Sequence, residues 1–209
     1  MSEPRTVAKN VQEVAPGVFH WQIQDERIHH ISDAHAIVEG GRAVLIDPVP
    51  LPEDALRRLG RIEAIVLGSP SHQRAAWSLR KKTGARVHAP KGAAAKLEEK
   101  PDVEYGDGDA LPGGLRAVHA PGPAATHYVL HRPAAPGAIF VTDVVMNETD
   151  RGLVFLSDKY QEDPRRSRDS VRRLLDLEFG VVCFGHGAPL RSGGREALRA
   201  LLESEKGNA

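Results

Sequence analysis

The chain of 209 residues carries 28 Lys and Arg against 28 Asp and Glu, so its formal net charge is zero. A chain of this length suits one domain, 1–209, built around a shared hydrophobic core. Balanced charge excludes the strong overall field that draws proteins to nucleic acid or to anionic membranes. We therefore expect no nucleic-acid or membrane partner, and a small molecule or another protein instead.

The N-terminal residues MSEPRTVAKNVQEV are too polar for a signal peptide, and no apolar run approaches the roughly 20 residues that span a bilayer. Cys183 is the single cysteine, which excludes an intramolecular disulfide and is typical of a reducing compartment. Its VVCF context favours an inert core residue over a nucleophile. We expect a soluble, cytoplasmic protein.

Hydrophobic periodicity and turn residues divide the first half of the chain into strands and helices. The expected strands, of which the first three read as antiparallel, are 17–23, 34–39, 43–47, 62–68 and 85–90. The expected helices are 52–60, 73–84 and 91–100. Glycine closes the first two helices, and basic residues fill the last turn of the second.

The second half again places strands before helices. Its expected strands are 115–120, 126–132, 138–143, 152–157 and 181–184. Its expected helices are 165–180 and 193–206, the first with arginines and aspartates interspersed as on a solvated, ion-paired face. Two such halves predict an α/β sandwich in which two mixed β-sheets pack face to face, with helices on both outer faces (αββα).

Unusual polar residues gather in loops that follow apolar strands, where α/β proteins usually place their sites. These loops are LIDP at 45–48, SPSHQRA at 69–75, APGP at 120–123 with VTD at 141–143, and FGHG at 184–187. Together with the opening EVAPGVFHW, their order resembles the metallo-β-lactamase superfamily of hydrolases over nearly the whole chain. The resemblance implies the αββα fold.

The resemblance also implies which metal ligands remain. The superfamily's first ligand motif, T-H-x-H-x-D-H, aligns with Ser69–Ala75, where His72 is the one ligand kept. Pro70, Arg74 and Ala75 stand at the other ligand positions, and Pro123 stands where the superfamily's P-G-H turn has its histidine. Asp143 and His186 match two later ligands.

A dinuclear centre is therefore not expected. A single divalent ion, zinc, manganese or iron, held by His72, Asp143 and His186 stays open, since catalytic zinc commonly takes three protein ligands. Asp47 would orient the ligand loop through hydrogen bonds, or would simply form a turn before Pro48. For Arg74 we hypothesise a direct ion pair with Asp143, in which the guanidinium replaces the lost metal charge.

Plainer interpretations stand beside these. His72 and His186 are polar loop residues if no ligand binds, and a compensating imidazole could come from His35, His119 or His127. The pair His29–His30 is expected in an exposed loop.

Three functions stay open. The first is a non-catalytic or weakly catalytic relative, a pseudoenzyme, whose pocket of Ser69, His72, Arg74, Asp143 and His186 binds a small ligand. The second is a hydrolase of an ester, thioester or lactone-like substrate, with Asp143 or His186 as general base, or with Ser69 or Ser71 activated by His72. The third is an interaction protein, such as a homodimer, with a vestigial site.

Overall fold

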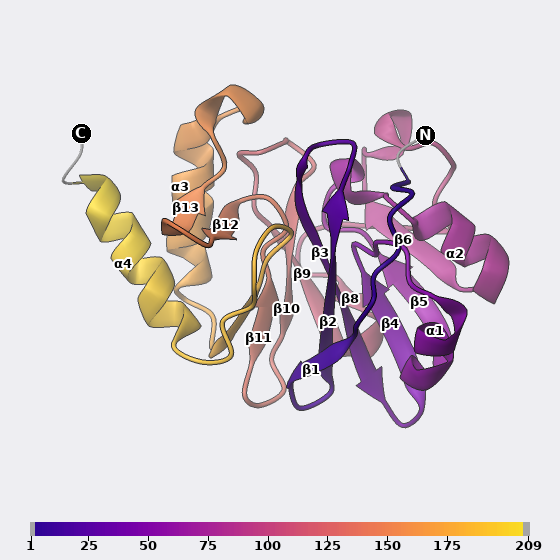
Figure 1. Ribbon diagram of the computed structural model, residues 1–209. Coiled ribbons are helices and arrows are strands. Elements are labelled where there is room, and N and C mark those ends of the chain that lie inside the picture. Colours follow the sequence, from indigo (N-terminus) through magenta and orange to yellow (C-terminus); the bar gives the residue numbers. More distant parts are fainter. Residues whose placement is uncertain (1–2, 207–209) are drawn as a thin grey trace.

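A seven-stranded sheet and a five-stranded sheet pack face to face in the computed structural model, which describes residues 3–206 (Figure 1). The first sheet has the order β1-β2-β3-β4-β5-β6-β7. Its strands are β1 Gln12–Ala15, β2 Val18–Asp25, β3 His30–Glu39, β4 Arg42–Ile46, β5 Arg61–Val66, β6 Arg86–Pro90 and β7 Val103–Tyr105. Strands β1 to β4 are antiparallel and β4 to β7 are parallel, so the sheet is mixed.

The second sheet has the order β14-β11-β10-β9-β8 and is also mixed, because β11 and β14 run parallel. Its strands are β8 Ala110–Leu111, β9 Leu115–His119, β10 Tyr128–Arg132, β11 Ala138–Phe140 and β14 Val181–Cys183. A separate hairpin pairs β12 Val145–Glu148 with β13 Gly152–Phe155.

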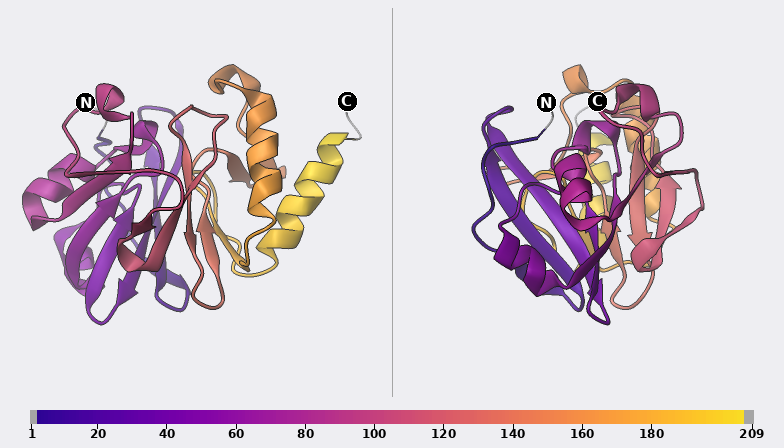
Figure 2. Two further views of the ribbon diagram at one scale, coloured as in Figure 1. Left: turned by 180° about the vertical axis from the view of Figure 1, so that it is seen from behind. Right: turned by 90° about the vertical axis from the view of Figure 1, so that its right-hand side faces the viewer.

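Four α-helices in the described part of the chain cover the outer faces of the two sheets. They are α1 Glu53–Leu59, α2 Ala76–Thr83, α3 Pro164–Leu174 and α4 Gly194–Lys206. Helices α1 and α2 lie outside the first sheet, and α3 and α4 lie outside the second (Figures 1 and 2). Within residues 3–206, no helix combines the length and apolarity that crossing a membrane requires.

Three apolar layers hold this arrangement together. Side chains such as Ile37 and Phe140 form the layer between the sheets. Trp77 of α2 packs into a second layer on the outside of the first sheet, and Leu174 of α3 packs into a third on the outside of the other sheet. A helix stripe and a sheet face must each be buried against another element, so these layers confirm the predicted αββα sandwich. Cys183 is buried in the central layer, as expected of an inert core residue, and burial raises the pKa of its thiol.

One predicted helix is wrong. The alanine-rich segment 91–100 contains a single 3₁₀ turn, η2 Ala94–Lys96. The Gln73 side chain takes up backbone groups there, because its amide nitrogen donates to the Lys96 carbonyl (3.3 Å) and its oxygen accepts from the Glu98 N–H (2.7 Å). A tertiary contact thus outweighs the helix propensity of alanine.

Other boundaries also differ from the predictions. Helix α3 ends at Leu174 instead of 180, because the following N–H groups of Asp176 and Leu177 bond to carbonyls three residues back. The strand predicted at 138–143 ends at Phe140, which releases Thr142 and Asp143 into a loop. The sequence analysis also missed several short strands, β1, β7, β8 and β12.

Candidate functional site

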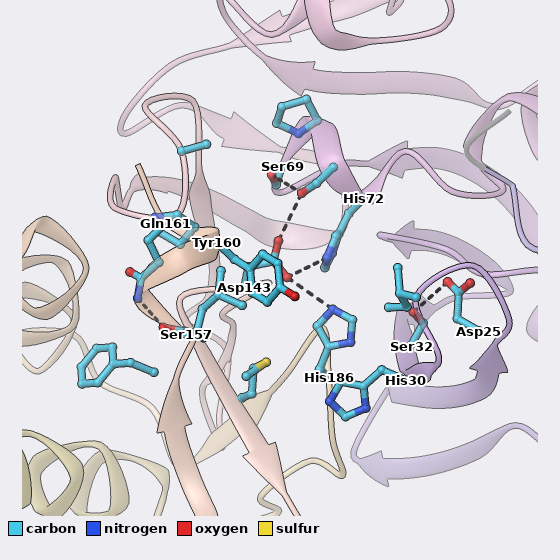
Figure 3. Close-up of a pocket in the computed structure, with 18 of the residues that line it drawn as sticks. Asp25, His30, Ser32, Ser69, His72, Asp143, Ser157, Tyr160, Gln161 and His186 are labelled. Carbon is cyan, nitrogen blue, oxygen red and sulfur yellow. Dashed lines mark hydrogen bonds and ion pairs between the residues drawn. The ribbon is translucent and has the colours of Figure 1, made fainter. Parts of the chain in front are cut away.

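The loops singled out in the sequence meet at one edge of the sandwich, because β4, β5, β11 and β14 each end there. They border an open cavity of about 1290 Å³. Ser69, His72, Asp143 and His186 line this cavity (Figure 3). Arg74 lines it as well. The β12–β13 hairpin and the segment 156–162 form a second wall, which we call the far wall. The turn between β2 and β3 forms a third wall.

His72 is buried between two carboxylates. Its Nδ1 lies 3.1 Å from Oδ2 of Asp47, and its Nε2 lies 2.8 Å from Oδ1 of Asp143. Burial and the charge of Arg74 lower the pKa of His72, but Asp143 and Asp47 together outweigh them and hold that pKa above its ordinary value. Each ring nitrogen of His72 therefore faces a carboxylate oxygen.

Asp143 is the centre of the cluster. Its Oδ1 also lies 3.5 Å from Nε2 of His186, and its Oδ2 accepts a hydrogen bond from the Ser71 hydroxyl (3.1 Å). Burial would raise the pKa of Asp143, but the charges and hydrogen bonds of His72 and His186 hold it well below its usual range. Asp143 is therefore a carboxylate in this environment.

One donor atom from each of His72, Asp143 and His186 lies within 4.8 Å of the other two. Each imidazole is oriented through its other nitrogen, since His72 Nδ1 faces Asp47 and His186 Nδ1 donates to the Ile31 carbonyl (2.6 Å). Such support on Nδ1 is the usual arrangement of a metal-binding histidine. By chemistry and orientation, these three groups fit one divalent ion.

Arg74 is buried beside this cluster, but the hypothesised ion pair with Asp143 is wrong. Its guanidinium donates to the carbonyls of Asp33 (2.7 Å), Asp47 (3.3 Å) and Gly185 (3.3 Å), and no carboxylate of residues 3–206 lies within 4.0 Å of it. Its Nη2 lies 3.2 Å from Nε2 of His72, the same nitrogen that faces Oδ1 of Asp143. The Arg74 charge acts on Asp143 through space only.

Asp47 connects the loop after β5 with the loop after β11. Its Oδ1 accepts from the Gly68 N–H (2.8 Å), and its Oδ2 accepts from the Thr142 hydroxyl (3.1 Å) and faces His72. Asp47, Arg74 and Thr142 all adopt left-handed φ angles (46°, 34° and 53°), which cost energy for residues other than glycine. The resemblance-based role, in which Asp47 orients the ligand loop, agrees with these contacts.

The structure does not support a nucleophilic serine with His72 as its general base. Ser71 donates to Asp143, and its hydroxyl exchanges a 2.8 Å hydrogen bond with Ser69. Neither serine hydroxyl is hydrogen-bonded to His72, so the structure does not supply a serine activated by that imidazole.

The other histidines do not complete a metal site. The Asp143 N–H donates to Nε2 of His127, whose Nδ1 faces the Ala120 carbonyl, so both ring nitrogens are occupied. Burial lowers the pKa of His127 to about 4. His119 donates to the Ala125 carbonyl, and His35 lies between the sheets, where its ring contacts His20 and Phe140.

Sequence analysis missed two residues of this region. Asp33, in the middle of β3, accepts from the Gly187 N–H (2.7 Å) and pairs with the buried His20 (2.6 Å), which ties β3 to the loop that carries His186. An aspartate within an otherwise buried strand was the available signal. His30 is exposed, as expected, but it lies at the start of β3 and lines the cavity.

Comparisons with known proteins identify the family and the fold of the chain. The family model described as the metallo-beta-lactamase superfamily matches residues 12–205. No curated protein matches the sequence significantly.

Solved structures share the fold at low sequence identity. A metallo-beta-lactamase from Pontibacter korlensis superposes with a TM-score of 0.74 at 18% identity, covering 93% of this chain and 98% of the other. The DIM-1 metallo-beta-lactamase gives 0.74 at 15% identity, covering 96% and 99%. An archaeal superfamily protein from Sulfolobus tokodaii gives 0.66 at 17% identity, covering 83% and 79%. With the family match spanning nearly the whole sequence, the chain belongs to the metallo-beta-lactamase superfamily.

Proposed function

We propose that the protein binds a small organic ligand in the cavity, and that its cluster is held together by protein charges instead of a dinuclear metal centre. The observation that carries this proposal is the guanidinium of Arg74, buried 3.2 Å from Nε2 of His72. That nitrogen is the atom through which His72 would bind a metal. A permanent cation at this distance opposes a divalent ion there.

Charge balance supports the same conclusion. Asp47 and Asp143 face the two nitrogens of His72, and their charges act on the buried cation of Arg74 within the same network. Buried charges are tolerated when they are paired and hydrogen-bonded. The resemblance to the superfamily motif adds that Pro70, Ala75 and Pro123 offer no metal ligand at their positions, so the residues do not fit two ions.

A second candidate, a mononuclear hydrolase of an ester, thioester or lactone-like substrate, rests on a different observation. His72, Asp143 and His186 bring three donor atoms within 4.8 Å, which fits one zinc, manganese or iron ion. When bound, such an ion would lower the pKa of a water ligand. Asp47 and the Ile31 carbonyl would hold the two imidazoles in place.

No comparable observation favours a role as an interaction protein. The exposed large apolar side chains among residues 3–206 are Val7, Ile28 and Tyr160, and the last two line the cavity. They support the ligand site and not a separate apolar surface.

A fragment screen by ligand-observed NMR tests the proposal. We expect cavity-binding fragments with the metal-free wild type and their loss in Gly185→Ala, because a Cβ at position 185 would lie 2.5 Å from Cε1 of His72. Gly180→Ala is the matched control, since its nearest contact would be 3.4 Å. Absence of any fragment that distinguishes the two variants would contradict the proposal.

A further inference from the structure

His30 lies on the cavity beside the cluster. Its ring stacks on that of His186, with centroids 5.5 Å apart and planes inclined by 16° (Figure 3). It comes from the start of β3, whereas His186 comes from the loop after β14, so the fold brings the two rings together from distant parts of the chain.

The backbone of Ile31 fixes which nitrogen of each ring carries a hydrogen. The Ile31 N–H donates to Nδ1 of His30 (2.9 Å), so this nitrogen must be an acceptor and the hydrogen of His30 lies on Nε2. The Ile31 carbonyl accepts from Nδ1 of His186 (2.6 Å), so that ring has the opposite tautomer when neutral. No acceptor within residues 3–206 hydrogen-bonds Nε2 of His30, which therefore offers a donor at the cavity surface.

The charges that line the cavity leave an excess of cations. Three cations at its rim are paired with carboxylates, namely Arg27 with Asp25, Lys96 with Glu162, and Arg151 with Glu148. Lys159 has no ion-pair partner among the described side chains, and its ammonium lies 4.6 Å from the Tyr160 ring centroid. Arg74 already faces the charges of Asp47 and Asp143 within the cluster, so Lys159 is the lining cation left for a ligand. Such a cavity attracts anions.

Apolar side chains stand beside these polar groups. Ile28, in the β2–β3 turn, and Tyr160 are half exposed or more (50% and 65%), and Met146 and Phe155 line the far wall. Ligand sites commonly combine such apolar walls with a few placed polar groups. The cavity thus suits a molecule with an oxyanion at one end and an apolar body at the other.

We propose that His30 is a ligand-contacting residue whose Nε2–H donates to an oxygen of a carboxylate or phosphate carried on an apolar body. This inference rests on the proposed function, because it names the ligand class of the same cavity. His30 selects the ligand and takes no part in the cluster of His72, Asp143 and His186.

Binding of benzoate and of inorganic phosphate, measured by NMR titration of the full chain, tests the inference. His30→Phe keeps a ring for stacking and removes the donor, whereas His30→Gln keeps an N–H near Nε2 and removes the ring. We expect benzoate affinity to fall about tenfold in His30→Phe and to be largely retained in His30→Gln, as for a hydrogen bond to a charged group. His29→Asn, at an exposed position that does not line the cavity, is the matched control and should bind like wild type.

Binding of inorganic phosphate distinguishes the contribution of the oxyanion from that of the apolar body. We expect it to bind more weakly than benzoate because it lacks an apolar body, and to show the same dependence on His30. Equal affinity of both His30 variants and wild type would overturn the inference. A loss of benzoate affinity in His30→Gln alone would also overturn it, because that result would indicate that the His30 ring acts only by stacking. Failure of wild type to bind either anion would overturn the ligand class, whereas the fragment screen would still decide the proposed function.

Discussion

Arg74 sets the character of the site at the scale of single residues. Arg74 is 2% exposed, and its guanidinium donates to three carbonyl oxygens that belong to three separate loops or strands. It therefore acts both as a cation in the cluster and as a clamp between β3, the loop after β4 and the loop after β14. Removing it would leave carbonyls unpaired and the cluster negatively charged.

Arg74→Ala should lower the free energy of unfolding by roughly 2–5 kcal/mol, the range for leaving buried polar groups and charges unpaired. Urea denaturation measures the change. Arg57→Ala is the matched control, because Arg57 forms an exposed i,i+4 pair with Glu53 and should cost at most about 0.5 kcal/mol. Similar losses in the two variants would argue against the clamp.

Gly185 limits how closely the two histidine loops approach. A Cβ there would lie 2.5 Å from Cε1 of His72 and 2.6 Å from the Thr142 carbonyl oxygen. Gly185→Ala should displace the His72 ring while the sandwich stays folded, visible as shifted imidazole signals of His72 and His186 with a retained far-UV circular dichroism spectrum. Unchanged imidazole signals, as expected for Gly180→Ala, would contradict this packing.

Three of the cluster residues could be predicted from the sequence, because His72, Asp143 and His186 each follow an apolar strand in the order of the superfamily motifs. The side chain that Arg74 contacts could not be predicted in this way. Local sequence places Arg74 two residues after His72, but it does not show that the guanidinium would meet Nε2 of His72 instead of Asp143. His30 was missed because a histidine in a polar turn gives no sign of which loop it will face.

At the scale of elements, α3 shows how the far wall of the cavity is fixed. Asp163 is the N-cap of this helix, and its side chain accepts from the N–H groups of Arg165 (3.0 Å) and Arg166 (3.2 Å), with Pro164 at the first helical position. The segment that precedes it, from Leu156 to Glu162, lines the cavity.

Asp163→Ala should lower the free energy of unfolding by about 1 kcal/mol, the usual cost of removing a capping side chain. Asp163→Asn should lose much less, since asparagine caps nearly as well. Thermal or urea unfolding of the two variants checks this. Equal losses would indicate that the negative charge, and not the cap, stabilises the helix end.

Elements with strong local signals were predicted well, and those decided by distant contacts were not. Arginines and aspartates at helical spacing predicted a helix at 165–180, and α3 forms over Pro164–Leu174. The segment 91–100 has alanines typical of a helix, yet Gln73 binds its backbone and leaves a single turn. The β12 strand pairs with β13 in a small separate hairpin, and its sequence VMNE lacks the apolar run of β5.

At the scale of the whole molecule, buried neutral histidines should make stability depend on pH. Burial lowers the pKa of His35 well below its ordinary value, that of His88 to a lesser degree, and that of His127 to about 4. In the unfolded chain these groups titrate near 6.5. As the pH falls from about 6.5 toward 4, the unfolded chain binds protons that the folded chain does not, so stability is lost.

The melting temperature should therefore fall between pH 6.5 and pH 5, with His127 alone contributing about 3 kcal/mol by pH 4. His72 has the opposite effect, because its pKa is raised in the folded protein. The stabilisation that His72 contributes is complete below pH 6.5 and is lost as the pH rises above its folded pKa. Calorimetry at pH 7, 6.5, 6 and 5 measures the trend. A melting temperature that stays constant from pH 6.5 to 5 would contradict it.

The sandwich itself could be predicted because strands precede helices in both halves of the chain, and the three apolar layers follow from that order. The central claim concerns charge at the edge where these layers end: the buried Arg74 cation, 3.2 Å from Nε2 of His72, opposes a metal ion beside Asp143. Its most direct test is elemental analysis of the purified wild type after exposure to zinc, manganese and iron and removal of loosely held ions. The account predicts no stoichiometric metal, whereas about one ion per chain, lost in His72→Ala and in Asp143→Ala, would contradict it and favour the mononuclear hydrolase.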